Sequence, residues 1–440
     1  MDIFVGIIIG LIVLMFLVTA HEFGHFLMAR KNGVRVLEFG ICFPPRAIAW
    51  IKDPKTGKWR RLPRSEWEKE KISKTVLSDG DKTKALAERG LIFSLNWLPI
   101  GGFCQMDGES AADTREGTFG KASYWAKTKI LFGGVMMNWL VAFIILTILA
   151  WTGMPEFLEG QFTVASDTRT ERMPVQITSV AKDSPAEKAG LADEDYILAI
   201  NGEEVKNTDE ITKLNQEHAG EKITYKIRRN VNCDSDNESI YEECKEATAE
   251  QSILPVEREL TAKLNPKDSE YLLGVTMASS QAMSYSTWSA PIVGAGLTLQ
   301  ITGETFKGVG MMIWNLISGI GSQLSFDATV RETGKEAISA VGDSVSGPVG
   351  IIGVLFPAFT SAGPANLAFL AAIISISLAC MNVLPIPALD GGRWFLITIF
   401  KLRKKKLTKD IEEKIVSRAF IALLALIFIV TILDIVRIAR

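Results

Sequence analysis

The sequence predicts a mainly α-helical, polytopic membrane protein with four transmembrane helices and one water-compatible α/β domain outside the membrane. Four long apolar segments each approach the ~20 residues that a helix needs to cross a hydrocarbon core. Hydrophobic residues make up 48% of the 440 residues, and a stretch of mixed composition at 157–340 separates the second apolar segment from the third. The formal net charge of −2 gives no reason to expect a nucleic-acid partner.

The apolar segments lie at 3–25, at 130–154, from roughly 365 to 389 and at 416–433. A cleaved signal peptide is the alternative for the first segment. It is disfavoured because Asp2 stands where a basic residue would be expected, and because no small-residue cleavage pattern follows the apolar run. We therefore expect four membrane-crossing helices.

Basic residues set the expected orientation. Ten Lys or Arg lie at 30–64 and six at 401–409, so both regions should face the cytoplasm, with both termini and the mixed stretch outside. A further segment at 308–326 is uncharged and long enough to cross. Counting it as a span would place the second basic cluster outside, so we expect it, together with 288–302, to form helix along the outer interface.

The first span ends in the string H-E-x-x-H, formed by His21, Glu22 and His25. On a helix this spacing places both imidazoles on one face, where they can bind one Zn²⁺ while the glutamate between them acts as general base. Ionisable groups at membrane depth are costly and are functional candidates. The alternative is a polar cluster that merely ends a membrane helix.

The mixed stretch contains signals of a small α/β domain. Ser184 begins a predicted helix that Gly190 ends, and a strand at 196–200 leads into a tight turn at 201–202. This string resembles the PDZ domains of bacterial periplasmic proteases, which capture peptides by strand addition. The region 173–264 fits one such domain, and an unspecified small α/β domain is the alternative.

Two features of the outer segment stay open. Cys233 and Cys244 bracket an acidic insertion and could form a disulfide in an oxidising compartment, or remain two isolated thiols. Residues 265–340 show no second copy of the PDZ-like string, which leaves open a degenerate second domain. The other three cysteines have no metal-ligand spacing, and we expect them to be reduced.

A third metal ligand is expected at the end of the third span. The remaining histidine, His218, lies in the outer domain, whereas Asp390 follows the helix-breaking Pro385 and Pro387 at membrane depth. Both motifs fall in the cytoplasmic half of their spans. The alternative is an aspartate that simply ends a helix before basic residues.

Together, the H-E-x-x-H string, the string N-x-x-P-x-P-x-L-D-G at 382–391 and the intervening outer domain resemble the site-2 protease family of intramembrane zinc metalloproteases. The similarity covers nearly the whole chain. It implies bound Zn²⁺, held by His21, His25 and Asp390, with Glu22 activating the attacking water. It also implies that Asn382, with Pro385 and Pro387 in the same string, holds the substrate backbone.

Other strings match the family less completely. Residues 97–106, which include Gly101 and Gly102, resemble a membrane-associated β-hairpin whose edge would bind unwound substrate. The string at 132–138 corresponds to a family string but lacks its usual proline, so its role is open. The charged insertion at 53–89 has no role that the sequence assigns.

The predicted organisation follows from these assignments. In chain order it comprises a first transmembrane helix (1–30), a cytoplasmic loop (31–122) with the β-hairpin near 92–106, a second transmembrane helix (123–154), an extracytoplasmic PDZ-like domain (155–264), an extracytoplasmic segment with an interfacial helix (265–345), a third transmembrane helix (346–400), a basic cytoplasmic loop (401–415) and a fourth transmembrane helix (416–440).

The expected function is cleavage of transmembrane segments in single-span membrane proteins within the cell inner membrane. Anti-sigma factors or remnant signal peptides are the substrates that the resemblance implies, and a peptide ligand is expected at the PDZ-like domain. Two other functions remain as alternatives. A membrane metal-ion transporter would also use buried His, Asp and Glu, and a catalytically silent PDZ scaffold would explain the outer domain alone.

Overall fold

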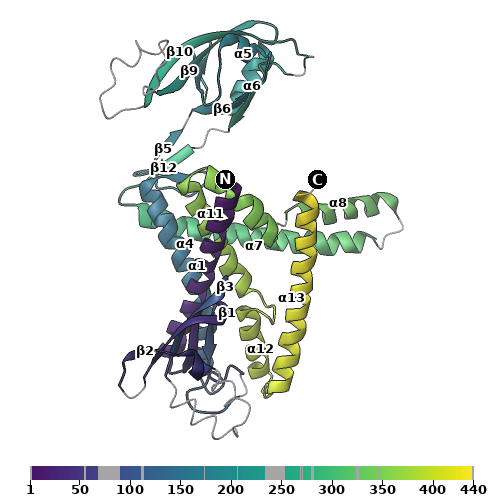
Figure 1. The fold of residues 1–440 in the computed structure, drawn as a ribbon. Helices are drawn as coiled ribbons and strands as arrows, with labels where there is room; N and C mark the ends of the chain where they lie inside the picture. Colours follow the sequence, from purple (N-terminus) through teal and green to yellow (C-terminus); the bar gives the residue numbers. More distant parts are fainter. Residues whose placement is uncertain are drawn as a thin grey trace. The chain divides into compact units, whose positions relative to one another are not determined.

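The computed structural model describes residues 2–53, 56–67, 90–110, 113–172, 174–205, 207–232, 253–267, 269, 271–278, 282–323, 327–344 and 347–438. The chain divides into two compact units, shown in Figure 1. The first unit comprises Met1–Met154, Phe162–Asp167 and Ser286–Arg440, and the second comprises Pro155–Gln161 and Thr168–Tyr285. Each unit is described by itself.

Four helices of the described chain are long and apolar enough to cross a membrane. They are α1 (Asp2–Lys31), α4 (Tyr124–Thr152), α11 (Pro364–Val383) and α13 (Lys409–Ile438). Each contains one of the predicted apolar segments or most of it, which confirms the four-span fold class. A helix satisfies its own backbone hydrogen bonds, so it is the form that an apolar segment adopts in lipid.

Helix α4 is the centre of the first unit, because it contacts α1, α11 and α7 (Ala290–Gln323). Its buried side chains include Ile130, Leu131 and Leu146. Helix α13 is mostly exposed along its length, as expected for a helix whose surface lipid would cover. The helices therefore pack around α4, with α13 at the periphery.

The described part of the fifth candidate span, residues 308–323, belongs to α7, a single helix of 34 residues that is not among the four membrane-crossing candidates. In the first unit α7 runs across the membrane-crossing helices, and α8 (Ala328–Ser344) packs beside it (Figure 1). The two stretches that the sequence analysis treated separately, 288–302 and 308–326, are thus largely one element.

A short helical stretch precedes α11 and packs against both α1 and α13. It consists of α9 (Pro348–Gly350), the π-helix η3 (Ile351–Leu355) and α10 (Phe356–Ser361), and it contacts α1. The buried carboxylate of Asp434 on α13 accepts the backbone N–H groups of Gly347 and Gly350 at 3.2 and 2.9 Å. These bonds satisfy donors at a helix start that water cannot reach.

A sheet lies between α1 and α4 in the sequence. Its strands are β1 (Val36–Lys52), β2 (Trp59–Arg61) and β3 (Ile92–Met106), in the order β2–β1–β3. The hairpin expected near 92–106 falls within β3, whose two halves pair with opposite sides of residues 36–41 of β1 and run in opposite directions, so that the chain reverses between them. Phe39 of β1, for example, faces Cys104 on one side and Phe93 on the other. Within the described chain, residues 102–106 pair with a strand on one side only and form an edge.

The second unit is a small α/β domain. Its main sheet has the order β10–β9–β7–β6–β11, with β8 paired to β7, and a separate ladder joins β5 and β12. The elements are β5 (Arg169–Arg172), β6 (Val175–Val180), α5 (Pro185–Ala189), β7 (Tyr196–Ile200), β8 (Glu203–Glu204), α6 (Thr208–Glu217), β9 (Lys222–Asn232), β10 (Ile253–Lys263), β11 (Val275–Ala278) and β12 (Ala282–Tyr285). The two-residue strand β4 (Met154–Pro155) lies at the boundary between the units.

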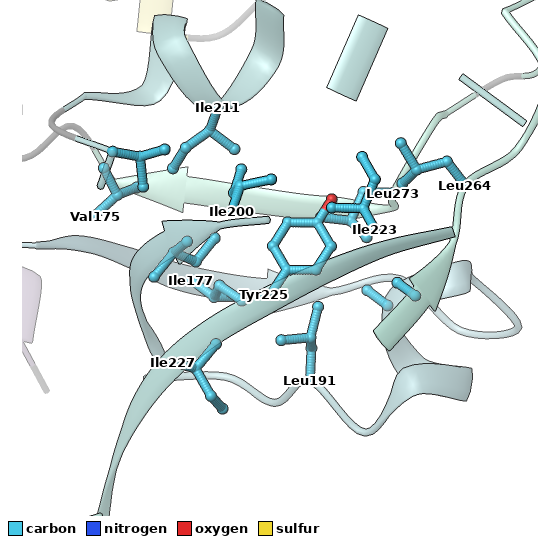
Figure 2. Close-up of a cluster of buried hydrophobic side chains, with 14 residues drawn as sticks. Val175, Ile177, Leu191, Ile200, Ile211, Ile223, Tyr225, Ile227, Leu264 and Leu273 are labelled. Carbon is cyan, nitrogen blue, oxygen red and sulfur yellow. The ribbon is translucent and has the colours of Figure 1, made fainter. Parts of the chain in front are cut away.

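The local signals in the sequence have the structures expected of them. Ser184 caps α5 by accepting the N–H of Glu187 at 3.1 Å, and Gly190 ends the helix in the left-handed conformation. Asn201 and Gly202, both with positive φ, form the turn between β7 and β8. Figure 2 shows the core of this unit, where Tyr225 lies among aliphatic side chains. The hydroxyl of Tyr225 donates to Oδ1 of Asn215 at 2.6 Å.

A buried ion pair holds the loop that follows α5. Asp195 is 0% exposed and makes two bonds of 2.6 Å with the guanidinium of Arg229 on β9, while its Oδ2 accepts the N–H of Ala192 at 2.9 Å. Arg229 also donates to the carbonyl of Gly190 at 2.8 Å. The pair therefore ties the end of α5 to the centre of the sheet.

We expect Asp195→Ala to destabilise the second unit by about 3 kcal/mol, because it leaves the cation of Arg229 without its buried partner. Hydrogen exchange of the β7 and β9 amides in the full chain should become about 100-fold faster. Asp195→Asn, which keeps the size of the side chain and part of its hydrogen bonding, should lose less stability. Unchanged protection in Asp195→Ala would show that the pair contributes nothing to stability.

Candidate metal centre

Three potential ligand atoms converge between α1 and α12 (Asp390–Leu402). His21 Nε2 lies 3.1 Å from Asp390 Oδ2 and 3.1 Å from His25 Nε2, and His25 Nε2 lies 3.3 Å from the same carboxylate oxygen. Both imidazoles are buried. The structure therefore brings the two sequence motifs together across 369 residues.

The spacing of these atoms suits zinc. A tetrahedral site with bonds of 2.0–2.1 Å has edges of about 3.3 Å between its ligand atoms. The three observed edges lie at or slightly below that length. Two imidazole nitrogens and one carboxylate oxygen are also a ligand set found in catalytic zinc sites, which keep a further position for water or substrate. The group thus fits a catalytic Zn²⁺.

Helix α4 contacts both imidazoles at Nδ1, the nitrogen that is not part of the metal group. Nδ1 of His25 is 2.8 Å from the carbonyl oxygen of Ile130, which can accept its proton and leave Nε2 free for a metal. Nδ1 of His21 is 3.2 Å from the amide of Asn138, a side chain that is 0% exposed.

The amide of Asn138 could adopt either of two orientations, and a metal bound to His21 Nε2 would favour the one that turns Oδ1 toward this ring. With Nδ2 toward His21, its Oδ1 is buried and has no hydrogen-bond partner in the described chain. Turning the amide over lets Oδ1 accept the Nδ1–H of His21 and leaves the Nε2 lone pair of that ring for the metal. Asn138 is therefore suited to hold His21 in the metal-binding tautomer.

The carboxylate ligand begins a helix that follows an irregular loop. Residues 384–389 connect α11 to α12, and the loop is closed by backbone bonds from Ile386 N to Leu384 O and from Leu389 N to Ile386 O, each 2.8 Å. A Cβ at Gly392 would lie 1.9 Å from the carbonyl oxygen of Ile386, so the loop can pack on α12 only where that helix has glycine.

Glu22 lies beside the ligands and contacts the sheet. Its Oε2 accepts the backbone N–H of Cys104, on the edge of β3, at 3.1 Å. The same edge continues at Met106, whose N–H donates to Glu109 at 3.1 Å. Gly101 and Gly102 lie against Val18 and Thr19, just before His21 on α1. The unpaired edge of β3 therefore runs beside the metal group.

A cavity of about 270 Å³ opens at this centre. It is lined by the metal group, Glu22, Asn138 and Asn382, together with apolar side chains of α1 and α11. Asn382 donates to the carbonyl of Leu378 at 3.0 Å, which leaves an amide oxygen and one N–H for other partners. The predicted residues Pro385 and Pro387 shape the loop but do not line the cavity.

Some predictions fall outside this centre. Cys233 and Cys244 lie outside the described residues, as does most of the insertion at 53–89, so their pairing and role stay predictions. Cys42, Cys104 and Cys380 are free thiols. None of these three belongs to the metal group.

The sequence analysis missed two features of α4 that contact the ligands. Asn138 was noted only as the end of a string without a role, although an amide inside an otherwise apolar span is a signal of function. Gly134 allows the close approach of His21, because a Cβ there would lie 2.5 Å from Nε2 of that ring. The contact of Cys104 with Glu22 had no signal in the sequence.

Known proteins resemble the chain over almost all of its length. A model of peptidase family M50 matches residues 9–60 and 71–427. The regulator of sigma-W protease RasP of Bacillus subtilis (strain 168) is 25% identical over 483 residues, covering 99% of each protein. The zinc metalloprotease RasP of Shouchella clausii (strain KSM-K16) is 28% identical over 317 residues, covering 72% of this chain and 61% of that protein.

We expect Asn138→Leu to weaken zinc binding by about 10- to 100-fold, the usual effect of removing a partner that orients a metal-binding histidine. Asn138→Asp keeps an acceptor for His21 and should bind zinc nearly as tightly as the parent. Competition with a chelator measures both affinities. Equal zinc affinity in Asn138→Leu and the parent would contradict the assigned role.

Proposed function

The chain belongs to peptidase family M50, the site-2 proteases, and from this premise we propose that it cleaves the membrane-spanning segments of single-span proteins. It is an intramembrane zinc metalloprotease with four candidate spans. The observation that carries the proposal is the position of Glu22, which shares the cavity with the metal group and the edge of β3. A silent scaffold needs no carboxylate there, a metal-ion transporter needs no strand edge beside its metal group, and the zinc metalloprotease relative favours the enzyme.

The residues of the centre have distinct proposed roles. His21, His25 and Asp390 would hold the Zn²⁺, which when bound would supply a Lewis acid for the scissile carbonyl. Glu22 takes a proton from the attacking water and then transfers it to the leaving amine. The N–H of Cys104 keeps the Glu22 side chain in place before substrate arrives. Asn382 lines the same cavity and is proposed to bind the substrate backbone.

The substrate must enter in an extended form. In a helix every carbonyl in the middle of the span accepts a hydrogen bond, so the scissile carbonyl is not available for attack. Among the residues that the structure describes, the edge of β3 at 102–106 pairs on one side only, and it lies beside Glu22, where an unwound segment could add as a further strand. Gly102 begins this edge, and Gly101 directly precedes it. We propose that strand addition and bond cleavage occur together here.

The remaining assignments concern the surroundings of the enzyme. We propose a multi-pass protein of the cell inner membrane, with the metal group toward the cytoplasm and the second unit outside as a PDZ-like domain. That domain would bind peptides or exclude substrates with bulky outer parts. One relative is named as a regulator of sigma-W protease, which supports anti-sigma factors as substrates, and remnant signal peptides are the other proposed class.

Glu22→Gln should reduce cleavage of a single-span substrate by at least about 100-fold while zinc stays bound, because it removes the general base and keeps the metal ligands. Its amide oxygen can still accept the N–H of Cys104. Cleavage is measured with purified protein in detergent and zinc by elemental analysis. His21→Ala serves as the control that should lose both cleavage and bound zinc. A Glu22→Gln enzyme as fast as the parent would exclude this residue as base.

Substrates that unwind easily should be cleaved faster. Two Leu→Gly changes beside the cleavage site weaken a helix by about 1 kcal/mol each, so we expect cleavage to be severalfold faster. The matched control carries the same two changes at the far end of the substrate span. Cleavage rates of the two substrates are compared with the same enzyme. Equal rates would show that local unwinding does not limit the reaction.

A further inference from the structure

A second cavity, of about 570 Å³, lies at the other end of α12 from Asp390. Its walls come from the start of α4, the end of α12 and the turn that leads into α13. Five lysines line it, and no carboxylate side chain does so in the described chain. The five are Lys127, Lys401, Lys405, Lys406 and Lys409. Nothing in the proposed proteolysis uses this cavity.

The walls of this lysine cavity have a defined structure. The turn after α12 is closed by backbone bonds from Lys404 N to Lys401 O at 3.1 Å and from Lys405 N to Phe400 O at 3.0 Å, with Lys404 in the left-handed conformation. This bond pattern is typical of a Schellman turn. On the opposite wall, the hydroxyl of Tyr124 is 3.0 Å from that of Thr398. The lysines are thus presented by fixed backbone.

Acidic side chains on α13 offset only part of the positive charge of the cavity, because Glu412 acts on Lys127 and Glu413 on Lys409. Glu412 pairs with Arg393 at 3.3 Å and accepts the hydroxyl of Ser110 at 3.0 Å. Glu413 pairs only at the rim, with Lys409 at 3.7 Å. Lys401 lies over the ring of Tyr124, with Nζ 3.7 Å from the ring centroid. An anion in the cavity would therefore meet several ammonium groups at once.

Apolar side chains beside the lysines point to the kind of anion. Ile397, Phe400 and Leu407 also line the cavity. Nearby on the same helix ends, Trp125 is 70% exposed and Leu402 is 77% exposed. Tryptophan concentrates at the level of lipid headgroups, so the mouth of the cavity lies where headgroups and the first acyl carbons would be.

We propose that the lysine cavity binds the phosphate headgroup of an anionic membrane lipid, with its acyl chains along the apolar side chains at the mouth. Basic pockets between transmembrane helices are suited to such headgroups. A free phosphate would satisfy the lysines alone, whereas a lipid satisfies both the lysines and the apolar rim. The bound lipid would join α4, α12 and α13 at one end of the membrane-spanning unit.

The test compares two double variants of equal charge in the full chain. Lys405→Gln/Lys406→Gln removes two lysines of the cavity, and Arg403→Gln/Lys404→Gln removes two cations of the same turn that do not line it. Each protein is purified in neutral detergent and titrated with dioleoylphosphatidylglycerol. Bound lipid is counted by native mass spectrometry.

Each lysine near an anionic headgroup contributes about 1 kcal/mol, so the cavity variant should bind the lipid about 30-fold more weakly than the parent. The control variant should stay within about threefold of the parent, and Lys405→Arg/Lys406→Arg should retain binding. Equal weakening in both glutamine variants would overturn the proposal in favour of diffuse surface attraction.

A second arm distinguishes the source of the phosphate. Thermal unfolding of the parent is measured with phosphatidylglycerol, with phosphatidylcholine, and with soluble glycerol phosphate. We expect only phosphatidylglycerol to raise the unfolding temperature, and only in proteins that keep Lys405 and Lys406. An equal rise with glycerol phosphate would show that the ligand is a free phosphate and not a lipid.

Discussion

The structure depends on bringing three metal ligands together at a depth where unpaired polar groups are costly. His21 and His25 come from one span, and Asp390 comes from the helix after another, so the site exists only if those helices pack side by side. Helix α4 makes that packing possible. It contacts both α1 and α11, and its Asn138 and the carbonyl of Ile130 face the imidazoles. The same helix therefore provides the scaffold and the hydrogen bonds that orient the ligands.

Irregular backbone near this site is stabilised by its own hydrogen bonds and by close packing on α12. The loop at 384–389 bonds to itself and packs on glycines of α12. At the edge of β3 a side chain satisfies the backbone, because Glu22 accepts the N–H of Cys104. That bond links the proposed general base to the proposed substrate strand. Addition of a substrate would bring new backbone groups to this edge, next to the carboxylate that is needed for cleavage.

Helix α12 connects two chemically different sites. Its first residue supplies the metal-binding carboxylate, and its last turn supplies a wall of the lysine cavity. Between them, Arg393 pairs with Glu412 of α13, and Trp394 donates to Thr128 of α4 at 3.0 Å. Helix α12, with thirteen residues, thus links both α4 and α13 to the metal group. A lipid bound at the last turn of α12 would add to these contacts without contacting the metal group.

The sequence by itself determined the number of spans, the metal ligands and the local elements of the outer domain. Those features depend on apolar run length, helical spacing and turn chemistry, all of which are local. Only the tertiary structure decided which backbone faces Glu22, that the two halves of β3 flank the first half of β1, and that Asn138 and Gly134 meet His21. These contacts join residues about 40 to 120 positions apart in the chain. No short-range pattern encodes them, because they arise only when helices and strands pack.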